Sequence, residues 1–167
     1  MTGEDEFRQQ MNEFKASSQA HRNGVPVSIK LRVDSGCFHR EHSPHAYQII
    51  DKYRQSHLFD NFAFVEHENG PELLVYLSLI ATGVTLTASV IDFIATIIKA
   101  RSEGIKYADR KSEPIELVLR GFDEDGQLIE IKVLEIDSRR PVSRYHIEKT
   151  LMISANKMAS PNNAKKQ

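Results

Sequence analysis

Apolar and polar residues alternate along residues 25–33 and again along 115–136, which is the period-two pattern of β-strands with one buried face. Pro26, near the start of the first run, indicates an edge strand or the beginning of a strand. In the second run the sequence DEDG separates two alternating segments, which predicts a β-hairpin. The alternation changes phase at Val133–Leu134, so we expect a β-bulge at that point.

Helical patterns and one more strand pattern mark the remaining segments. Residues 3–19 carry a thin apolar stripe, at spacings of four and three, on an otherwise polar helix. The sequence SPHAYQIIDKYRQSH predicts a helix with Ser43 as its N-cap, and PVSRYHIEKTLMISANKM predicts another with Ser143 as its N-cap. A short strand is predicted at 61–67. The order strand, helix, strand favours a parallel arrangement of this strand and 25–33.

The longest apolar stretch, Leu73–Ile91, contains nineteen residues and no charge. Pro71 and Glu72 are typical of a helix start and basic residues follow the stretch, so we predict a helix over 72–101. This helix would be about 45 Å long at a rise of 1.5 Å per residue. One small sheet could not cover every side of so apolar a helix.

Small residues recur at intervals of three and four along this predicted helix. A stripe of small side chains lets another helix approach closely, so we expect these positions to form a protein interface. The candidate interface residues are Ser78, Ala81, Thr85, Ala88, Asp92 and Ala95.

The same stretch has two alternatives, a helical hairpin broken near Gly83 and a membrane span. Nineteen residues approach the length needed to cross the hydrocarbon of a bilayer, and Lys99, Arg101 and Lys106 could lie on the cytoplasmic side. However, the stretch also contains serine, threonine and glycine, and Asp92 follows it directly, which makes insertion marginal. We therefore expect the segment to pack within a protein, and a single-pass membrane-anchored accessory protein is the alternative.

Together these elements predict an α+β fold. We expect a mixed sheet of about four strands that includes a C-terminal β-hairpin, packed by helices among which the helix over 72–101 is the longest. The length of 167 residues suits one domain. We assign 1–20 to an N-terminal helical segment, 21–158 to the single α+β domain and 159–167 to a disordered tail.

Composition narrows the classes of function. The chain carries 22 basic and 23 acidic residues, so there is no global electrostatic reason to expect nucleic acid as a partner. Its single cysteine, Cys37, excludes an internal disulfide and fits a reducing compartment. The first residues, MTGEDEFRQQ, lack the basic start and apolar run of a secretory signal. We expect a cytoplasmic protein, with membrane association as the alternative.

One cluster of ligand-type side chains occurs in the sequence DSGCFHREHSPH. A zinc site needs four converging ligands, and the spacing here matches no zinc-site pattern. A metal-dependent hydrolase or nuclease built on residues 37–45 is therefore a second alternative, with Cys37, His39, His42 and His45 as candidate ligands. Phosphate-loop, dinucleotide-binding and hydrolase signatures are absent, so we predict no catalytic residue, no cofactor and no identifiable small-molecule ligand.

Residues 70–158 resemble a known family in their layout. An apolar helix rich in small residues, GPELLVYLSLIATGVTLTASVIDFIATIIKAR, is followed by a hairpin with an aspartate–glycine turn, IELVLRGFDEDGQLIEIKVLEI, and by a closing helix. This order resembles the effector-associated constant component of prokaryotic conflict systems. The resemblance implies a bacterial accessory module that works through association, and it supplies no catalytic residues.

The sequence therefore predicts a non-enzymatic interaction or scaffold module. We expect it to self-associate as a homo-oligomer or to bind a protein partner through the helix over 72–101. Its small residues would face the partner, and its leucine and isoleucine side chains would face the sheet.

Overall fold

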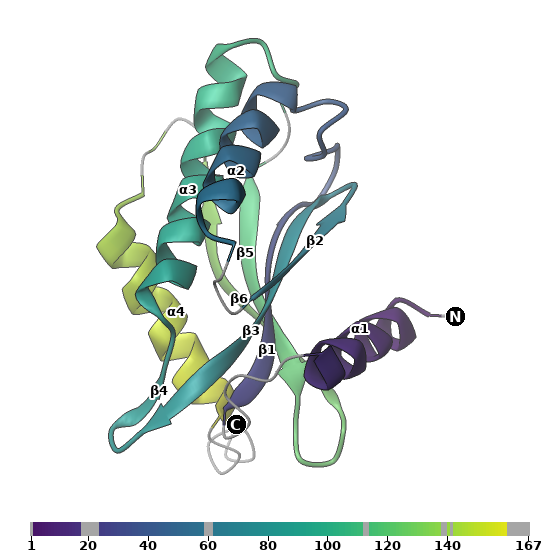
Figure 1. The fold of residues 1–167 in the computed structure, drawn as a ribbon, viewed down its shortest axis with the longest axis vertical. Coiled ribbons are helices and arrows are strands. Elements are labelled where there is room, and N and C mark those ends of the chain that lie inside the picture. The colour runs from purple at the N-terminus through teal and green to yellow at the C-terminus, as the bar shows by residue number, and fades with distance from the viewer. Residues whose placement is uncertain are drawn as a thin grey trace.

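The computed structural model describes residues 2–17, 24–58, 62–111, 114–137, 140 and 142–159. In this part of the chain, helices pack on both faces of a six-stranded antiparallel sheet (Figure 1). The elements are, in chain order, α1 (Gly3–Ser17), β1 (Val25–Val33), α2 (Pro44–Ser56), β2 (Ala63–His67), β3 (Gly70–Ile80), β4 (Gly83–Thr85), α3 (Ala88–Lys106), β5 (Ile115–Phe122), β6 (Leu128–Ile136) and α4 (Arg144–Ala159).

The strand order is β2-β3-β1-β5-β6, and β4 pairs with the end of β3. The predicted α+β class is confirmed, whereas the predicted mixed sheet of about four strands is wrong. β1 and β2 run in the same direction, but β3 lies between them and pairs antiparallel with both. From β1 to β5 the elements form a split βαβ arrangement, to which β6 and α4 are added. Pro26 lies at the start of the central β1, before its pairing with β5 begins at Ser28.

The predicted helix over 72–101 is wrong, because the apolar stretch forms β3, β4 and the beginning of α3. β3 is a central strand with both faces buried. Leu73, Val75 and Leu77 face the main core, while Leu74 faces a second cluster beneath α1. A strand that is buried on both faces reads as a continuous apolar run, and periodicity alone cannot distinguish it from a buried helix.

A tight turn joins β3 to β4 and separates the strands from α3. Gly83, the first residue of β4, has a φ of +136°, a backbone conformation that favours glycine. A Cβ atom at Gly83 would lie 2.1 Å from Asn156 Oδ1. This oxygen accepts a hydrogen bond from the Val84 amide, 2.9 Å away, so α4 holds β4 in place.

Helices α2, α3 and α4 cover one face of the sheet, which we call the inner face, and enclose the main core (Figure 1). Alternate residues of β1, β3 and β5 meet the apolar sides of these helices. The bulkiest fully buried side chains include Tyr47, Phe38, Phe93, Ile29, Leu31 and Ile50.

The predicted β5–β6 hairpin is confirmed, and so is its bulge. Val118 pairs with Lys132, while the preceding Leu117 pairs with Leu134. Val133 is therefore the extra residue on β6, at the point where the sequence alternation changes phase.

The N-terminus of α2 is capped from a distant part of the chain. Ser43 occupies the predicted N-cap position, but its side chain makes no capping hydrogen bond. Asp109, just beyond the end of α3, instead accepts hydrogen bonds from the backbone amides of His45 and Ala46 at 3.1 and 2.9 Å. Gly104 permits this approach, because a Cβ atom there would lie 2.1 Å from Asp109 Oδ2. The carboxylate thus ties α2 to the end of α3.

Among the described residues, no helix combines the length and the apolar character that a membrane crossing requires. The predicted disordered tail, 159–167, lies outside the described residues from position 160 onward.

Candidate functional site

The predicted metal ligands do not converge on one point. They are Cys37, His39, His42 and His45. Within the described ranges, no group of three or more potential ligands lies close enough to hold a metal ion. His39 lies 4.0 Å from the Glu66 carboxylate, whereas His45 contacts Asp109. Cys37 is a half-buried free thiol. The geometry of the 37–45 cluster therefore gives no support to a metal-dependent hydrolase or nuclease.

His45 and Asp109 form a carboxylate–imidazole pair that the sequence did not suggest. His45 Nδ1 lies 2.8 Å from Asp109 Oδ1, and the carboxylate is buried while the imidazole is exposed. Such a carboxylate can orient a histidine for general-base catalysis. Here, however, both carboxylate oxygens also cap α2. The capping of α2 therefore accounts for the position of Asp109 without a catalytic role for the pair.

The predicted interface residues do not share one helix face. They are divided between the β3–β4 ribbon, with Ser78, Ala81 and Thr85, and the first half of α3, with Ala88, Asp92 and Ala95. Ser78 and Thr85 face each other across the ribbon. Asp92 accepts a hydrogen bond from Arg144, which joins α3 to α4 within the chain. An interface along one continuous helix is therefore excluded by the fold.

The other face of the sheet, which we call the outer face, carries α1 on its apolar half (Figure 1). Phe7, Met11 and Phe14 of α1 are buried against Leu74 of β3. These side chains form an apolar cluster that is separate from the main core. We call the sheet residues of this cluster the α1-docking surface; they are Ala63, Val65, Leu74, Tyr76 and Phe122.

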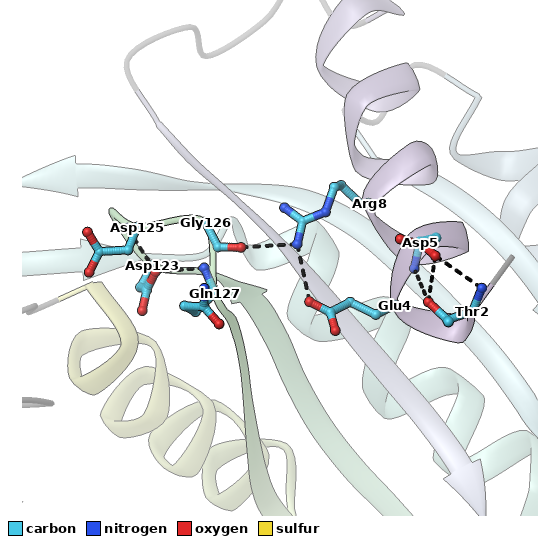
Figure 2. Close-up of polar contacts among 8 residues, drawn as sticks. All are labelled: Thr2, Glu4, Asp5, Arg8, Asp123, Asp125, Gly126 and Gln127. Atoms are coloured by element: carbon cyan, nitrogen blue, oxygen red, sulfur yellow. Dashed lines mark hydrogen bonds and ion pairs between the residues drawn. The ribbon is translucent and has the colours of Figure 1, made fainter.

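Polar contacts fix the position of α1 along the outer face (Figure 2). Arg8 Nη2 donates a hydrogen bond to the Gly126 carbonyl in the β5–β6 turn, 3.0 Å away. The turn is itself held by the Asp123 carboxylate, which accepts hydrogen bonds from two of its backbone amides. At the start of α1, Thr2 and Asp5 each bond the backbone amide of the other, which is the reciprocal arrangement of a capping box.

Beside the α1-docking surface, a buried carboxylate on β3 contacts side chains from three other strands. Glu72 is fully buried and accepts hydrogen bonds from Ser28 on β1 and Arg120 on β5. His67 Nε2 on β2 lies 2.9 Å from its other oxygen. Phe7 of α1 lies over the guanidinium group of Arg120, 4.2 Å from ring centroid to Cζ. The carboxylate cluster and the α1-docking surface are therefore in direct contact.

The cluster keeps Glu72 ionised. Burial by itself raises the pKa of this carboxyl group. The hydrogen bond from His67, the positive charge of Arg120 and the Ser28 hydroxyl outweigh burial and lower the pKa to about 2. Glu72 is thus a fixed anion at neutral pH, and its proton is not available for acid catalysis.

The order of contacts does not match a catalytic triad, although serine, histidine and a carboxylate are all present. In a triad the histidine lies between the nucleophile and the carboxylate. Here Glu72 lies between Ser28 and His67. Ser28 is also fully buried, so its hydroxyl cannot reach a substrate. The cluster therefore does not support acyl transfer.

The remaining part of the outer face is charged, and its charges pair with one another. Arg32 contacts Glu116 and Glu130 at 3.4 and 2.7 Å, and Lys132 contacts Glu116 and Glu135 at 3.4 and 2.9 Å. The Lys132–Glu135 pair is exposed on both sides and contributes little to stability. The outer face thus has a hydrated charged half and an apolar half, and α1 covers the apolar half.

No local sequence pattern marks this region of the sheet. Ser28 lies on β1 and Arg120 on β5, and both meet Glu72 only through the strand register. One local signal was present, since Glu72 is a single charge at the border of a long uncharged stretch. In the predicted helix over 72–101, Glu72 would occupy the first turn.

Comparison of the chain with protein-family models, with curated proteins and with solved structures finds no match.

Proposed function

We propose that this chain is a non-enzymatic interaction module that binds an amphipathic helix of a partner protein on the outer face of its sheet, where α1 lies in the absence of the partner. The observation that carries the proposal is the way α1 is bound. Its apolar contact with the sheet consists of one side of a single amphipathic helix. Recognition of this kind reads apolar anchors at successive helical turns, and a helix from another protein can supply the same anchors.

The contacts of α1 define the chemistry of the partner helix. Phe7 meets the ring of Phe122 edge-on at 5.2 Å, and Phe14 stacks on Tyr76 at 4.9 Å. Met11 lies between them on the same side of the helix. We therefore expect a partner helix with two aromatic residues seven positions apart and a flexible apolar residue between them.

The energetics allow α1 to be replaced. Full burial of a Phe or Met side chain stabilises by about 1.5–3 kcal/mol, so the three side chains contribute on the order of 5–9 kcal/mol. Ordering a fifteen-residue helix, which is marginal by itself in water, offsets much of this gain. Arg120 Nε, under Phe7, is buried without a hydrogen-bond partner in the described part of the chain, which costs about 1–3 kcal/mol more. To replace α1, a partner helix must bind with a free energy larger than the burial gain of α1 minus these two costs.

The proposal replaces the interface along 72–101 and retains the expectation of association. It agrees with the resemblance to the effector-associated constant component, which implies a module that works through binding. Exchange of α1 between two copies would use the same contacts and would give a homo-oligomer.

The test uses a fluorescently labelled peptide of residues 2–17 and the full-length chain. In the variant Phe7→Ala/Met11→Ala/Phe14→Ala, α1 loses its apolar side and leaves the docking surface open. We expect the peptide to bind this variant with a dissociation constant below about 1 mM, which corresponds to about 4 kcal/mol, and to bind the unsubstituted chain much more weakly. Fluorescence anisotropy measures both affinities.

Two controls make the test specific. A peptide with the same three alanines should bind neither protein. A matched triple variant on the exposed side of α1, Gln9→Ala/Asn12→Ala/Lys15→Ala, should bind the peptide as weakly as the unsubstituted chain does. Equal affinity of the peptide for all three proteins, or no binding to the variant that lacks the apolar side while that variant still unfolds cooperatively, would refute the proposal.

A further inference from the structure

A cavity of about 520 Å³ lies between α3 and the paired ends of β5 and β6. Its volume falls within the range of about 300–1,000 Å³ typical of small-molecule sites. The cavity lies on the inner face of the sheet, because Ile98, Ile115 and Ile136 from its walls are also part of the main core. The cavity is therefore separate from the α1-docking surface on the outer face.

The walls of the cavity follow from local structure. Ala95, Ile98 and Ser102 recur along α3 at intervals of three and four, so one side of this helix forms one wall. Ile115, the first residue of β5, pairs with Ile136, the last residue of β6, and these two side chains close the floor. The interior surface next to the core is thus apolar.

The walls of the same cavity carry more basic than acidic side chains. Among the described residues, four basic side chains line the cavity against two acidic ones, an excess of two positive charges. The basic side chains are Lys99, Arg101, Lys106 and Arg140, and the acidic ones are Glu103 and Asp137. Arg101 is 4% exposed, so its guanidinium group lies in the wall and not in bulk water. Burial lowers the pKa of Arg101 and nearby Asp137 opposes the shift, which indicates a partly desolvated cation.

We propose that this cavity binds a small amphipathic anion, with an alkyl or aromatic body against the isoleucine floor and a single anionic head group at Arg101 and Lys99. An apolar body gains by displacing water from the floor. The head group gains from a charge-assisted interaction in a site of reduced polarity. A carboxylate and a phosphate share this chemistry, while a cation of the same size opposes the net positive charge of the walls.

The experiment titrates the full-length protein with four ligands that share a ten-carbon tail: decanoate, decyl phosphate, decanol and decyltrimethylammonium. Calorimetry gives the affinities below the micellar concentrations, and amide chemical shifts locate the site. We expect at least one of the two anions to bind at least tenfold more tightly than the ammonium ion, with shifts confined to α3 and the paired ends of β5 and β6. Comparison of decanoate with decyl phosphate identifies the preferred head group.

Two variants separate the body of the ligand from its head group. Ala95→Phe fills the cavity from α3 and should abolish the binding of every ligand. Arg101→Met removes the charge and keeps the length of the side chain, so it should weaken the anions about tenfold and change decanol less than twofold. Lys99→Met is the second variant for the head group should Arg101→Met fail to fold, and the exposed Lys52→Met on α2 is the matched control that should change nothing.

Several results overturn the proposal: no binding of either anion at millimolar concentration, equal affinity for the anions and the ammonium ion, or unchanged binding in Ala95→Phe. Its failure and that of the proposed helix-binding function are distinguishable, because the peptide of residues 2–17 and the alkyl ligands address opposite faces of the sheet.

Discussion

Replacing Glu72 by glutamine removes one negative charge from the interior of the outer-face cluster and changes the volume of the side chain little. Arg120 and His67 would keep their positions, but Arg120 would lose its only carboxylate partner among the described residues. The Arg120 side chain is 13% exposed, so solvent cannot fully compensate for the lost charge. Breaking a buried ion pair by removing one partner costs about 3–5 kcal/mol.

An independent estimate comes from the ionisation of Glu72. The pKa of this carboxyl group falls from 4.5 to about 2 in the folded protein. At 1.36 kcal/mol per pKa unit, the ionised form contributes about 3 kcal/mol to folding. Because the folded pKa is the lower one, this contribution is present above pH 4.5 and is lost as the pH falls through about 2. Both routes give a similar cost for Glu72→Gln at neutral pH.

The assay is urea unfolding followed by circular dichroism at pH 7, 5, 4, 3 and 2. The free energy of unfolding of Glu72→Gln should lie about 3–5 kcal/mol below that of the unsubstituted chain at pH 7. The difference should shrink toward zero near pH 2, where the carboxyl group is protonated in the unfolded chain and about half protonated in the folded one. Glu135→Gln is the matched control, since its ion pair with Lys132 is exposed and should be worth less than 1 kcal/mol. If the free energies of unfolding of Glu72→Gln and of the unsubstituted chain differ by the same amount at every pH, Glu72 does not supply this contribution.

Substitutions at two further positions, Gly83 and Asp109, test contacts of the helices on the inner face. Gly83→Ala should lower the free energy of unfolding by about 2 kcal/mol and the melting temperature by about 4–8 °C. The new Cβ atom would clash with Asn156, and a φ of +136° is strained for alanine. An unchanged melting temperature would contradict this prediction. Asp109→Ala should cost about 2–3 kcal/mol and speed hydrogen exchange at the amides of His45 and Ala46, which lose their acceptor. Asp109→Asn keeps one acceptor oxygen and should be intermediate, so equal losses in the two variants argue against capping.

The sequence predicted elements well where one face of a strand meets water. Lys30 and Arg32 alternate with buried residues in β1, and the phase change at Val133 located the bulge on β6. It failed at β3, where Leu73 belongs to the main core and Leu74 to the cluster under α1. The period-two signal disappears when both faces are apolar, and the length of the run then favours a helix.

Most of the candidate site could not be read from the sequence for a different reason. The α1 stripe was visible as a spacing of four and three, but nothing in the chain says which surface it meets. Ser28 and Arg120 meet Glu72 through strand pairing over separations of 44 and 48 residues, which local patterns do not encode, and only His67 lies near Glu72 in the sequence. Asp109 acts on α2 although it follows α3, so its capping role appears only when the two helices lie together.

The place of β1 in the middle of the sheet affects how this chain folds during translation and what its fragments expose. Both neighbours of β1 come later in the chain, and the second of them, β5, follows α3. During translation one edge of β1 therefore stays unsatisfied until most of the protein has left the ribosome, a non-local topology associated with slow folding and exposed aggregation-prone strands. A fragment that ends after α3 keeps that edge open, and an open edge of this kind can pair with another chain.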